Sequence, residues 1–353
     1  MIGLSPSKST DYSLWRSIRY LKRAKVHSPP IKLGENKWAI SPIQKAEAFS
    51  EFLAEVFKPN PEPLHPEDRI DPEKEMAMVE SEAPIPMDPI RKSEIEYLIK
   101  NKLKNKKAPG IDGITSEILK ELPDKATKQL ANIYNAILKL RHFREEWKKA
   151  EVVVIHKSGK PANKLSSYRP ISLLSCVGKL FERCYSKRLI KILDERKILP
   201  RHQFGFRAKH STIEQIHRVV DLIERSLERG EYCASVFLDI ATAFDKVWHE
   251  GLKLKLYKLF PANHFDLLES YLGGRSLRVR QDEAYSGFKS ILTGVPQGSV
   301  LGPVLFLIYM SDLPDVGEVL ISTYADETAG TAVGKTLRQS ISRLQRGVDQ
   351  IVD

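Results

Sequence analysis

Cysteine is scarce in this sequence, with three residues in 353. The spacing of the three matches no zinc-binding pattern and no disulfide framework. The sequence therefore predicts buried free thiols in a reducing compartment at Cys176, Cys184 and Cys233. Long apolar runs are also missing. The N-terminus has no secretory h-region, and no segment approaches the ~20 apolar residues of a membrane span. These absences exclude a disulfide-stabilised secreted domain and a membrane-spanning protein, so we expect an intracellular one.

Positive charge is what the chain has in excess. It carries 56 Lys and Arg against 45 Asp and Glu, for a formal net charge of +11. Such an excess favours a polyanionic partner, either nucleic acid or an acidic membrane surface. The apolar fraction of 42% is ordinary for a globular protein, and the length allows two or three packed subdomains. Charge alone does not choose the partner.

Periodicity and cap signals divide the chain into an N-terminal extension with a helix, a linker rich in proline and acids, a mainly helical region and a strand-rich region, at residues 1–58, 59–89, 90–230 and 231–353. The helix of the first part is predicted to begin after Ser41, because Pro42 suits the first helical position and Gln44 completes a capping box. The linker is predicted to be extended.

Further helices are predicted over residues 124–147, 179–196 and 211–227, and strands over residues 152–155, 233–238, 277–281 and 319–324. A turn at Gly159 predicts a hairpin after the first of these strands. Mixed helices and strands without strict βαβ alternation favour an α+β fold with an antiparallel sheet flanked by helices.

Acidic residues follow two of the predicted strands. Asp239 ends one of them, and Asp326 and Glu327 follow the apolar stretch VLISTY. Phosphoryl transfer to a nucleic acid needs two divalent ions about 4 Å apart, and Mg²⁺ prefers carboxylate oxygens as ligands. Acids at the ends of neighbouring strands meet this need. Taken alone, Asp239 would more often be a solvated turn residue, since turn aspartates are common.

A set of ordered segments favours the first interpretation. The stretches FLDIATAFDKVWH, GVPQGSVLGP and YADE resemble motifs A, B and C of reverse transcriptases. Upstream, KKAPGIDGI, WKKAEVVVIHKSGK, SSYRPISLLS and QFGFRAKHST resemble segments of the non-LTR retrotransposon class, most of all its arthropod jockey-type members. The resemblance implies a right-hand RNA-directed DNA polymerase, with fingers over 90–230 and palm over 231–353. Its partners would be an RNA template, a DNA primer and deoxynucleoside triphosphates.

The resemblance also assigns the metal and sugar positions. Asp239 and Asp326 match the family's aspartates for two Mg²⁺ ions, with Mn²⁺ as a substitute, and the backbone carbonyl of Ile240 matches a further ligand. Glu327 stands where the family has a second aspartate in motif C. Phe244 matches the aromatic residue beneath the incoming sugar, where it would exclude a 2′-hydroxyl; the alternative is core packing.

The remaining assignments concern the nucleotide and the template. Gln297 matches a residue beside the incoming nucleotide, and Gly298 one that lets the backbone approach the template-primer. Lys157 and Arg169 match cations that meet the triphosphate, and the basic segment 100–113 matches a template contact. For Lys157, Arg169 and the basic segment the alternative is a solvated surface charge.

Some features depart from the family pattern. Glu327 adds a methylene, and Gly330 replaces a bulky strand residue, which predicts a weak second arm of the hairpin. The chain begins after any endonuclease and ends at Asp353, so a truncated copy without its thumb is expected. The alternative function is a catalytically impaired remnant that only binds nucleic acid. A membrane-surface or scaffolding protein explains the charge but none of the motifs. Family analogy suggests the nucleus and the cytoplasm.

Overall fold

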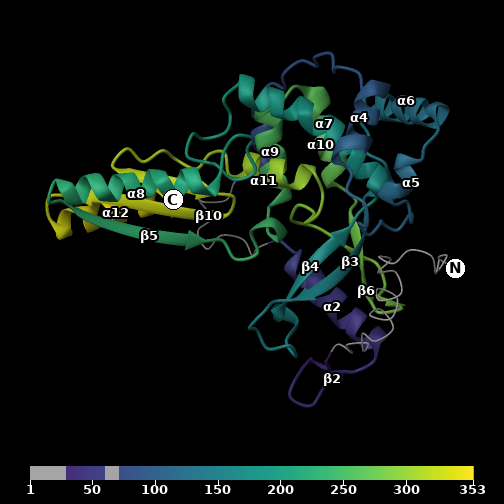
Figure 1. Cartoon of the computed structure of the whole chain (residues 1–353), viewed down its shortest axis with the longest axis horizontal. Coiled ribbons are helices and arrows are strands. Elements are labelled where there is room, and N and C mark those ends of the chain that lie inside the picture. Colours follow the sequence, from purple (N-terminus) through teal and green to yellow (C-terminus); the bar gives the residue numbers. More distant parts are fainter. Residues whose placement is uncertain (1–28, 60–70, 353) are drawn as a thin grey trace, which may run out of the picture.

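A computed structural model describes residues 29–59 and 71–352 of the chain. Figure 1 shows an elongated molecule with one sheet and two long helices at one end, a helical body toward the other end, and a second sheet with α2 below that body in this view. The helices are α2 (Pro42–Val56), α3 (Pro72–Met78), α4 (Lys92–Lys102), α5 (Ser116–Lys120), α6 (Asp124–Leu140), α7 (Cys176–Glu195), α8 (Thr212–Glu228), α9 (His249–Leu259), α10 (Ala262–Leu272), α11 (Leu301–Tyr309) and α12 (Leu337–Val352), with short 3-10 turns η2 (Glu145–Trp147), η3 (Leu165–Ser167) and η4 (Ala243–Asp245). The strands are β1 (Ile31–Lys32), β2 (Trp38–Ala39), β3 (Lys149–His156), β4 (Tyr168–Leu173), β5 (Tyr232–Asp239), β6 (Ser276–Gln281), β7 (Ala284–Tyr285), β8 (Lys289–Ser290), β9 (Val319–Tyr324) and β10 (Glu327–Gly334).

Strands β5, β10 and β9 form an antiparallel sheet in that order. The sheet is covered on one face by α12, whose Leu344 packs against a small cluster that includes Val319 and Ala332. Helix α8 lies on the opposite face, where it contacts β9 and β5. The predicted α+β fold with an antiparallel sheet and flanking helices is confirmed at this end of the molecule.

The second arm of the hairpin, predicted to be weak at Gly330, is a regular strand in the structure. Strand β10 runs unbroken through this residue, which pairs with Val236 of β5 and with Ile321 of β9. A Cβ at Gly330 would lie 3.5 Å from Leu344 of α12, which is ordinary van der Waals contact. Gly330 therefore does not interrupt the strand, and the space around it would accept a small side chain.

The second sheet has the order β4-β3-β6-β7, with β8 also paired to β6. Strands β3 and β4 form the predicted hairpin, whereas β3 and β6 are parallel, so this sheet is mixed. Helix α2 covers one face of it, where Phe49 and Leu53 pack against Leu277 and Val279 of β6. The predicted start of α2 is confirmed, since Ser41 and the following residues form a capping box.

The helical body surrounds the largest hydrophobic cluster, which draws residues from α4, α6, α7, α9, α10 and α11. Cys176 and Cys184 of α7 are buried free thiols, as predicted, whereas Cys233 of β5 is only half-buried. Burial raises the pKa of the Cys184 thiol to about 12. No helix within the described ranges combines the length and the apolarity needed to cross a bilayer.

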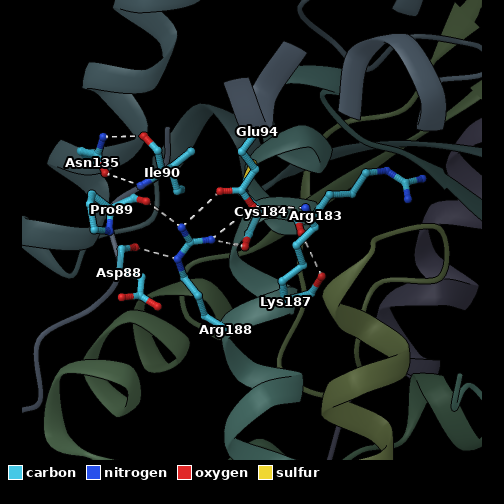
Figure 2. A network of polar contacts seen from close by, with 10 residues as sticks. Asp88, Pro89, Ile90, Glu94, Asn135, Arg183, Cys184, Lys187 and Arg188 are labelled. Carbon is cyan, nitrogen blue, oxygen red and sulfur yellow. Dashed lines mark hydrogen bonds and ion pairs between the residues drawn. The ribbon is translucent and has the colours of Figure 1, made fainter. Parts of the chain in front are cut away.

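Arg188 of α7 ties the chain before α4 to this body (Figure 2). Its guanidinium donates to the carbonyls of Asp88, Pro89 and Cys184 at 2.7, 2.9 and 2.6 Å, and it forms an ion pair with Glu94 of α4 at 3.2 Å. Its side chain is only 12% exposed. A nearly buried charge of this kind needs several partners, and here the partners fix the segment that enters α4.

Two predicted boundaries are wrong. The helix expected to reach Trp147 ends at Leu140, because Arg141 adopts a left-handed conformation with φ of 55°. Phe143 and Trp147 still face the core, with their rings 5.7 Å apart, so apolar spacing continues where the helix does not. The linker is not wholly extended, since α3 begins after Asp71, whose side chain caps it.

Candidate active site

The three acids predicted for metal binding lie at one end of the β5-β10-β9 sheet. Asp239, the last residue of β5, is the register partner of Glu327, the first residue of β10. Direct partners in an antiparallel sheet have Cβ atoms about 5 Å apart on one face. Asp326 precedes Glu327 in the turn that joins β9 to β10. The strand ends therefore bring the three acids to one end of the sheet, although Asp239 and Glu327 are almost ninety residues apart in the sequence.

The turn between β9 and β10 is held in an unusual backbone conformation. Tyr324 and Glu327 are paired, so the loop is Ala325 and Asp326, and Ala325 has φ of 61°. A residue with a side chain seldom adopts this left-handed region unless its surroundings hold it there. Ala325 is buried, with 6% exposure, which fits such a constraint.

The constraint comes from Gln203, whose side-chain amide grips Ala325 on both sides. Its Oε1 accepts hydrogen bonds from the backbone N–H of Ala325 at 3.0 Å and of Gly205 at 2.8 Å, and its Nε2 donates to the Ala325 carbonyl at 3.2 Å. A Cβ on Gly205 would overlap the backbone nitrogen of Ala325. Gln215 of α8 adds a hydrogen bond to the Thr323 carbonyl of β9. This part of the site is therefore anchored from outside the hairpin.

A groove of about 670 Å³ opens beside the acids, between α8 and the sheet. Asp239 and Glu327 lie at its acidic end, and Ile216, Val220 and Phe237 give it an apolar wall. These three apolar side chains are largely exposed. Asp239 and Glu327 thus face a solvent-accessible hollow and not the protein core.

Gln297, predicted to lie beside the nucleotide, contacts Asp245 of the motif that contains Asp239. The Nε2 group of Gln297 donates to Oδ1 of Asp245 at 2.7 Å. Burial raises the pKa of the Asp245 carboxyl to about 6, while the hydrogen bond from Gln297 and the charge of Lys157 act in the opposite direction. The backbone carbonyl of Gln297 accepts a hydrogen bond from Ser172 of β4, which ties this segment to the second sheet. Gly298 has φ of 109°, and a Cβ there would lie 2.8 Å from the Ser172 oxygen.

Phe244, the neighbour of Asp245 in the sequence, packs its ring against α11 and against the segment that contacts the acidic turn. Its ring stacks on Phe306 of α11, with centroids 4.6 Å apart, and meets the edge of Phe206 at 5.8 Å. Phe206 follows Gly205, so one short segment contacts both the turn at Ala325 and the ring of Phe244. Phe244 is only partly buried, and the contact with Phe306 shows that it does pack against the core.

Helix α11 is positioned by a buried carboxylate. Glu182 of α7 accepts hydrogen bonds from the backbone N–H groups of Val300 and Leu301 at 2.6 and 3.0 Å. A negative group at a helix N-terminus satisfies otherwise unpaired N–H groups. Burial raises the pKa of Glu182 even so. The segment from Gln297 to α11 is therefore fixed at both of its ends.

The predicted cations lie on the hairpin of the second sheet. Lys157 follows β3, and its ammonium group donates to the Ser166 carbonyl at 3.0 Å. Arg169 is exposed on β4, where it is the register partner of Ile155. The basic segment 100–113 is largely exposed, and Gly110 within it packs against the backbone of Ser175.

The acids suit a divalent metal by their chemistry. Their carboxylates are hard oxygen donors, the kind that Mg²⁺ prefers, and Ile240 places a backbone carbonyl directly after Asp239. In the described part of the chain, no group of three or more His, Cys, Asp or Glu side chains is close enough to hold an ion. The donors are therefore gathered at the sheet edge without being assembled into a finished coordination shell.

Sequence reasoning missed Asp245 and Gln203. Asp245 stands next to Phe244 in FLDIATAFDKVWH, where an acid looks like a solvated helix residue, yet it is 4% exposed. Gln203 opens the segment QFGFRAKHST and is 3% exposed. In both cases, the residue's place inside a recognisable motif was the only available signal.

The chain is similar to a known protein family and to several curated proteins. A model of the family described as reverse transcriptase (RNA-dependent DNA polymerase) matches residues 155–350. The chain is 42% identical over 330 residues to the probable RNA-directed DNA polymerase from transposon BS of Drosophila melanogaster, covering 90% of this chain and 36% of that protein. It is 38% identical over 355 residues to the RNA-directed DNA polymerase from mobile element jockey of the same species, covering 98% of this chain and 38% of that protein. The chain thus spans just over a third of the length of these relatives.

Proposed function

The chain belongs to the reverse transcriptase (RNA-dependent DNA polymerase) family, and we propose that it carries out RNA-directed DNA synthesis as part of a jockey-like non-LTR retrotransposon protein. Residues 90–230 would form the fingers and residues 231–353 the palm, with the extension 1–58 and the linker 59–89 before them. The similarity to the jockey and BS polymerases supports this proposal.

The register of β5 and β10 carries the proposal. It pairs Asp239 with Glu327 and leaves Asp326 in the adjoining turn, so acids from two separate motifs lie at one sheet edge. A site for nucleotidyl transfer needs carboxylates fixed by rigid backbone, because small misplacements reduce the rate steeply. The hydrogen bonds of Gln203 provide such rigidity at Ala325.

Asp239 and Asp326, with the Ile240 carbonyl, would hold two Mg²⁺ ions, and Mn²⁺ could replace them. When bound, such ions stabilise the attacking and leaving oxygens of a phosphoryl transfer. Glu327 would complete the acidic edge from its longer side chain.

The incoming nucleotide would lie between the acids and the second sheet. Gln297, held by Asp245, would contact the nucleotide, and Phe244 would lie beneath the sugar. Lys157 and Arg169 would meet the triphosphate from the β3-β4 hairpin. Gly298 and the basic segment 100–113 would face the RNA template and DNA primer. By family analogy the protein would work in the nucleus and the cytoplasm.

Primer extension on an RNA template with a DNA primer, deoxynucleotides and Mg²⁺ tests the proposal. Asp239→Asn and Asp326→Asn should each reduce synthesis by about a hundredfold or more, because a metal ligand is removed. Asp282→Asn, in an exposed turn outside the site, is the matched control. Synthesis at the wild-type rate in Asp239→Asn would contradict the proposal. Binding of the hybrid with no synthesis by the wild type would favour the remnant that only binds nucleic acid.

A further inference from the structure

The second sheet has one face that α2 does not cover. Along β6, Leu277 and Val279 point to α2 and are almost fully buried, so Arg278 and Arg280 point to the opposite face. The register places Glu151 of β3 directly beside Arg278, and Arg280 beside Tyr285 of β7. We call this the outer face of the sheet. Ile155 of β3 lies on the same face as Glu151, so its partner Arg169 on β4 lies there too.

Aromatic rings and cations are stacked on this face. The Arg278 guanidinium carbon lies 4.3 Å from the ring centre of Tyr285 and 5.5 Å from that of Phe288. The ammonium group of Lys149 lies 6.0 Å from the centre of the same Phe288 ring. Tyr285 and Phe288 nevertheless remain 42% and 48% exposed. Two large rings are thus held in place by cations while much of their surface is open to solvent.

The charged groups that contact the two rings are cations. Glu151 pairs with Arg278 at 3.3 Å and with Arg280 at 2.8 Å, but its side chain is 8% exposed against 26% and 38% for the arginines. The carboxylate of Glu151 is therefore the more buried partner, and the two guanidinium groups are the parts that solvent reaches. Lys149 adds a further positive charge near Phe288. The acids Asp282 and Glu283 form the turn between β6 and β7, next to the Arg280–Tyr285 pair.

We propose that Tyr285, Phe288 and Arg278 form a stacking platform for single-stranded nucleic acid, outside the polymerase cleft. Bases stack on aromatic rings and on guanidinium planes, and nearby cations attract the phosphates. A membrane surface would instead favour apolar side chains that can insert into the lipid. The exposed groups here are planar and cationic, which suits a nucleic-acid strand.

The location of the platform identifies the strand. Arg169 and Arg278 lie on one face of the same sheet, two strands and about four residues apart, on the order of 15–20 Å. A template strand that continues beyond the nucleotide site would cross this face. The assignment of the strand as the template rests on the proposed function, whereas binding of a single strand to the platform does not.

Fluorescence anisotropy with the full chain tests the platform. The probes are an RNA–DNA hybrid with a short 5′ template overhang, the same hybrid with a long oligouridine overhang, and free oligouridine. The wild type should bind the long overhang more tightly than the short one. Tyr285→Ala with Phe288→Ala should remove this gain, by about fivefold or more for each stacked base, and should leave binding of the short-overhang hybrid unchanged.

Further variants separate stacking from charge and from folding. Tyr285→Leu with Phe288→Leu keeps apolar bulk but removes the planar rings, so it should also lose the gain. Arg278→Lys keeps the positive charge but not the planar guanidinium group, and it should lose part of the gain in affinity from the long overhang. The matched control is Tyr232→Ala, which removes an exposed tyrosine at the far end of β5 from Asp239. This variant should bind the long overhang as tightly as the wild type does. Crosslinking of 4-thiouridine in the long overhang should label the segment 285–288.

Each result has a definite meaning. If the ring variants bind the long overhang as tightly as the wild type does, the platform is wrong. It is also wrong if these variants lose binding only to phosphatidylserine vesicles. If the wild type fails to bind the hybrid but binds oligouridine, and the ring variants weaken that binding, the platform stands while the proposed polymerase function fails.

Discussion

Gln297 donates a hydrogen bond to Asp245 at 2.7 Å and thereby joins two motifs that lie 52 residues apart in the sequence. Asp245 is a nearly buried carboxyl group, and Gln297 is the residue that the family resemblance places beside the incoming nucleotide. The contact fixes the Gln297 amide from one side, while Ser172 holds its backbone from the other.

The stability of the protein should respond to the titration of Asp245. Its pKa is raised to about 6 in the folded chain from 3.8, so the folded state holds the proton more tightly. The resulting stabilisation is fully present below pH 3.8 and is lost as the pH rises to about 6, by ~3 kcal/mol. Urea unfolding across this range should show the loss in the wild type relative to Asp245→Asn. Parallel curves for the two proteins would mean that Asp245 does not titrate in this way.

Removing the Gln203 amide should impair synthesis more than folding. Gln203→Leu keeps the approximate size but deletes three hydrogen bonds, two of them to Ala325. The turn that carries Asp326 would shift, and a shift of about 1 Å can cost about a hundredfold in rate. We expect a ten- to hundredfold decrease in primer extension. Gln345→Leu, on the exposed surface of α12, is the control, and equal activity in the two variants would refute the role of Gln203.

Replacing Glu327 by aspartate should have a modest effect. The charge and the pairing with Asp239 remain, and the carboxylate moves back by roughly one C–C bond, about 1.5 Å. Because Asp239 and Asp326 would supply the principal metal ligands, we expect primer extension to rise severalfold and the Mg²⁺ requirement to fall. Titration of the rate with Mg²⁺ in both proteins measures the change. A decrease in synthesis would show that the longer side chain is itself required.

Arg188 should contribute to stability without contributing to chemistry. Its replacement in Arg188→Met leaves the Glu94 carboxylate and three carbonyls without this donor, so we expect a loss of about 2–3 kcal/mol in the free energy of unfolding. Lys191→Met on the same helix removes an ion pair with Glu195 whose two side chains are each 64% exposed, and it should change little. Denaturant unfolding compares them. Similar losses in both would contradict the special role of the network.

Local sequence signals predicted the elements that carry the acids. The apolar runs before Asp239 and Asp326 become β5 and β9, and the capping box at Ser211 begins α8, because strand and cap patterns depend on neighbouring residues. The helix boundary near Trp147 was wrong because apolar residues on the core side continued past the backbone turn at Arg141. The segment 59–89 was predicted to be extended, whereas Asp71 caps α3, a short helix without buried residues.

Contacts between distant segments could not be predicted in this way. The bond between Gln297 and Asp245 and the grip of Gln203 on Ala325 join segments 52 and 122 residues apart. No fixed sequence spacing relates the two residues of either pair, because each contact forms only after separate elements have packed together. The acids could be assigned to strand ends from sequence, but the residues that hold them required the fold.

Two adjacent residues, Gly205 and Phe206, contact two separate parts of the candidate site. Gly205 lies against Ala325 without room for a Cβ, and the ring of Phe206 contacts Phe244, so one piece of backbone contacts both the acidic turn and Phe244. If the proposed roles of these residues hold, sugar discrimination and metal preference would be coupled. Substitutions at Phe244 and at Ala325 should be non-additive in their effects on synthesis, even though no other part of the chain need change.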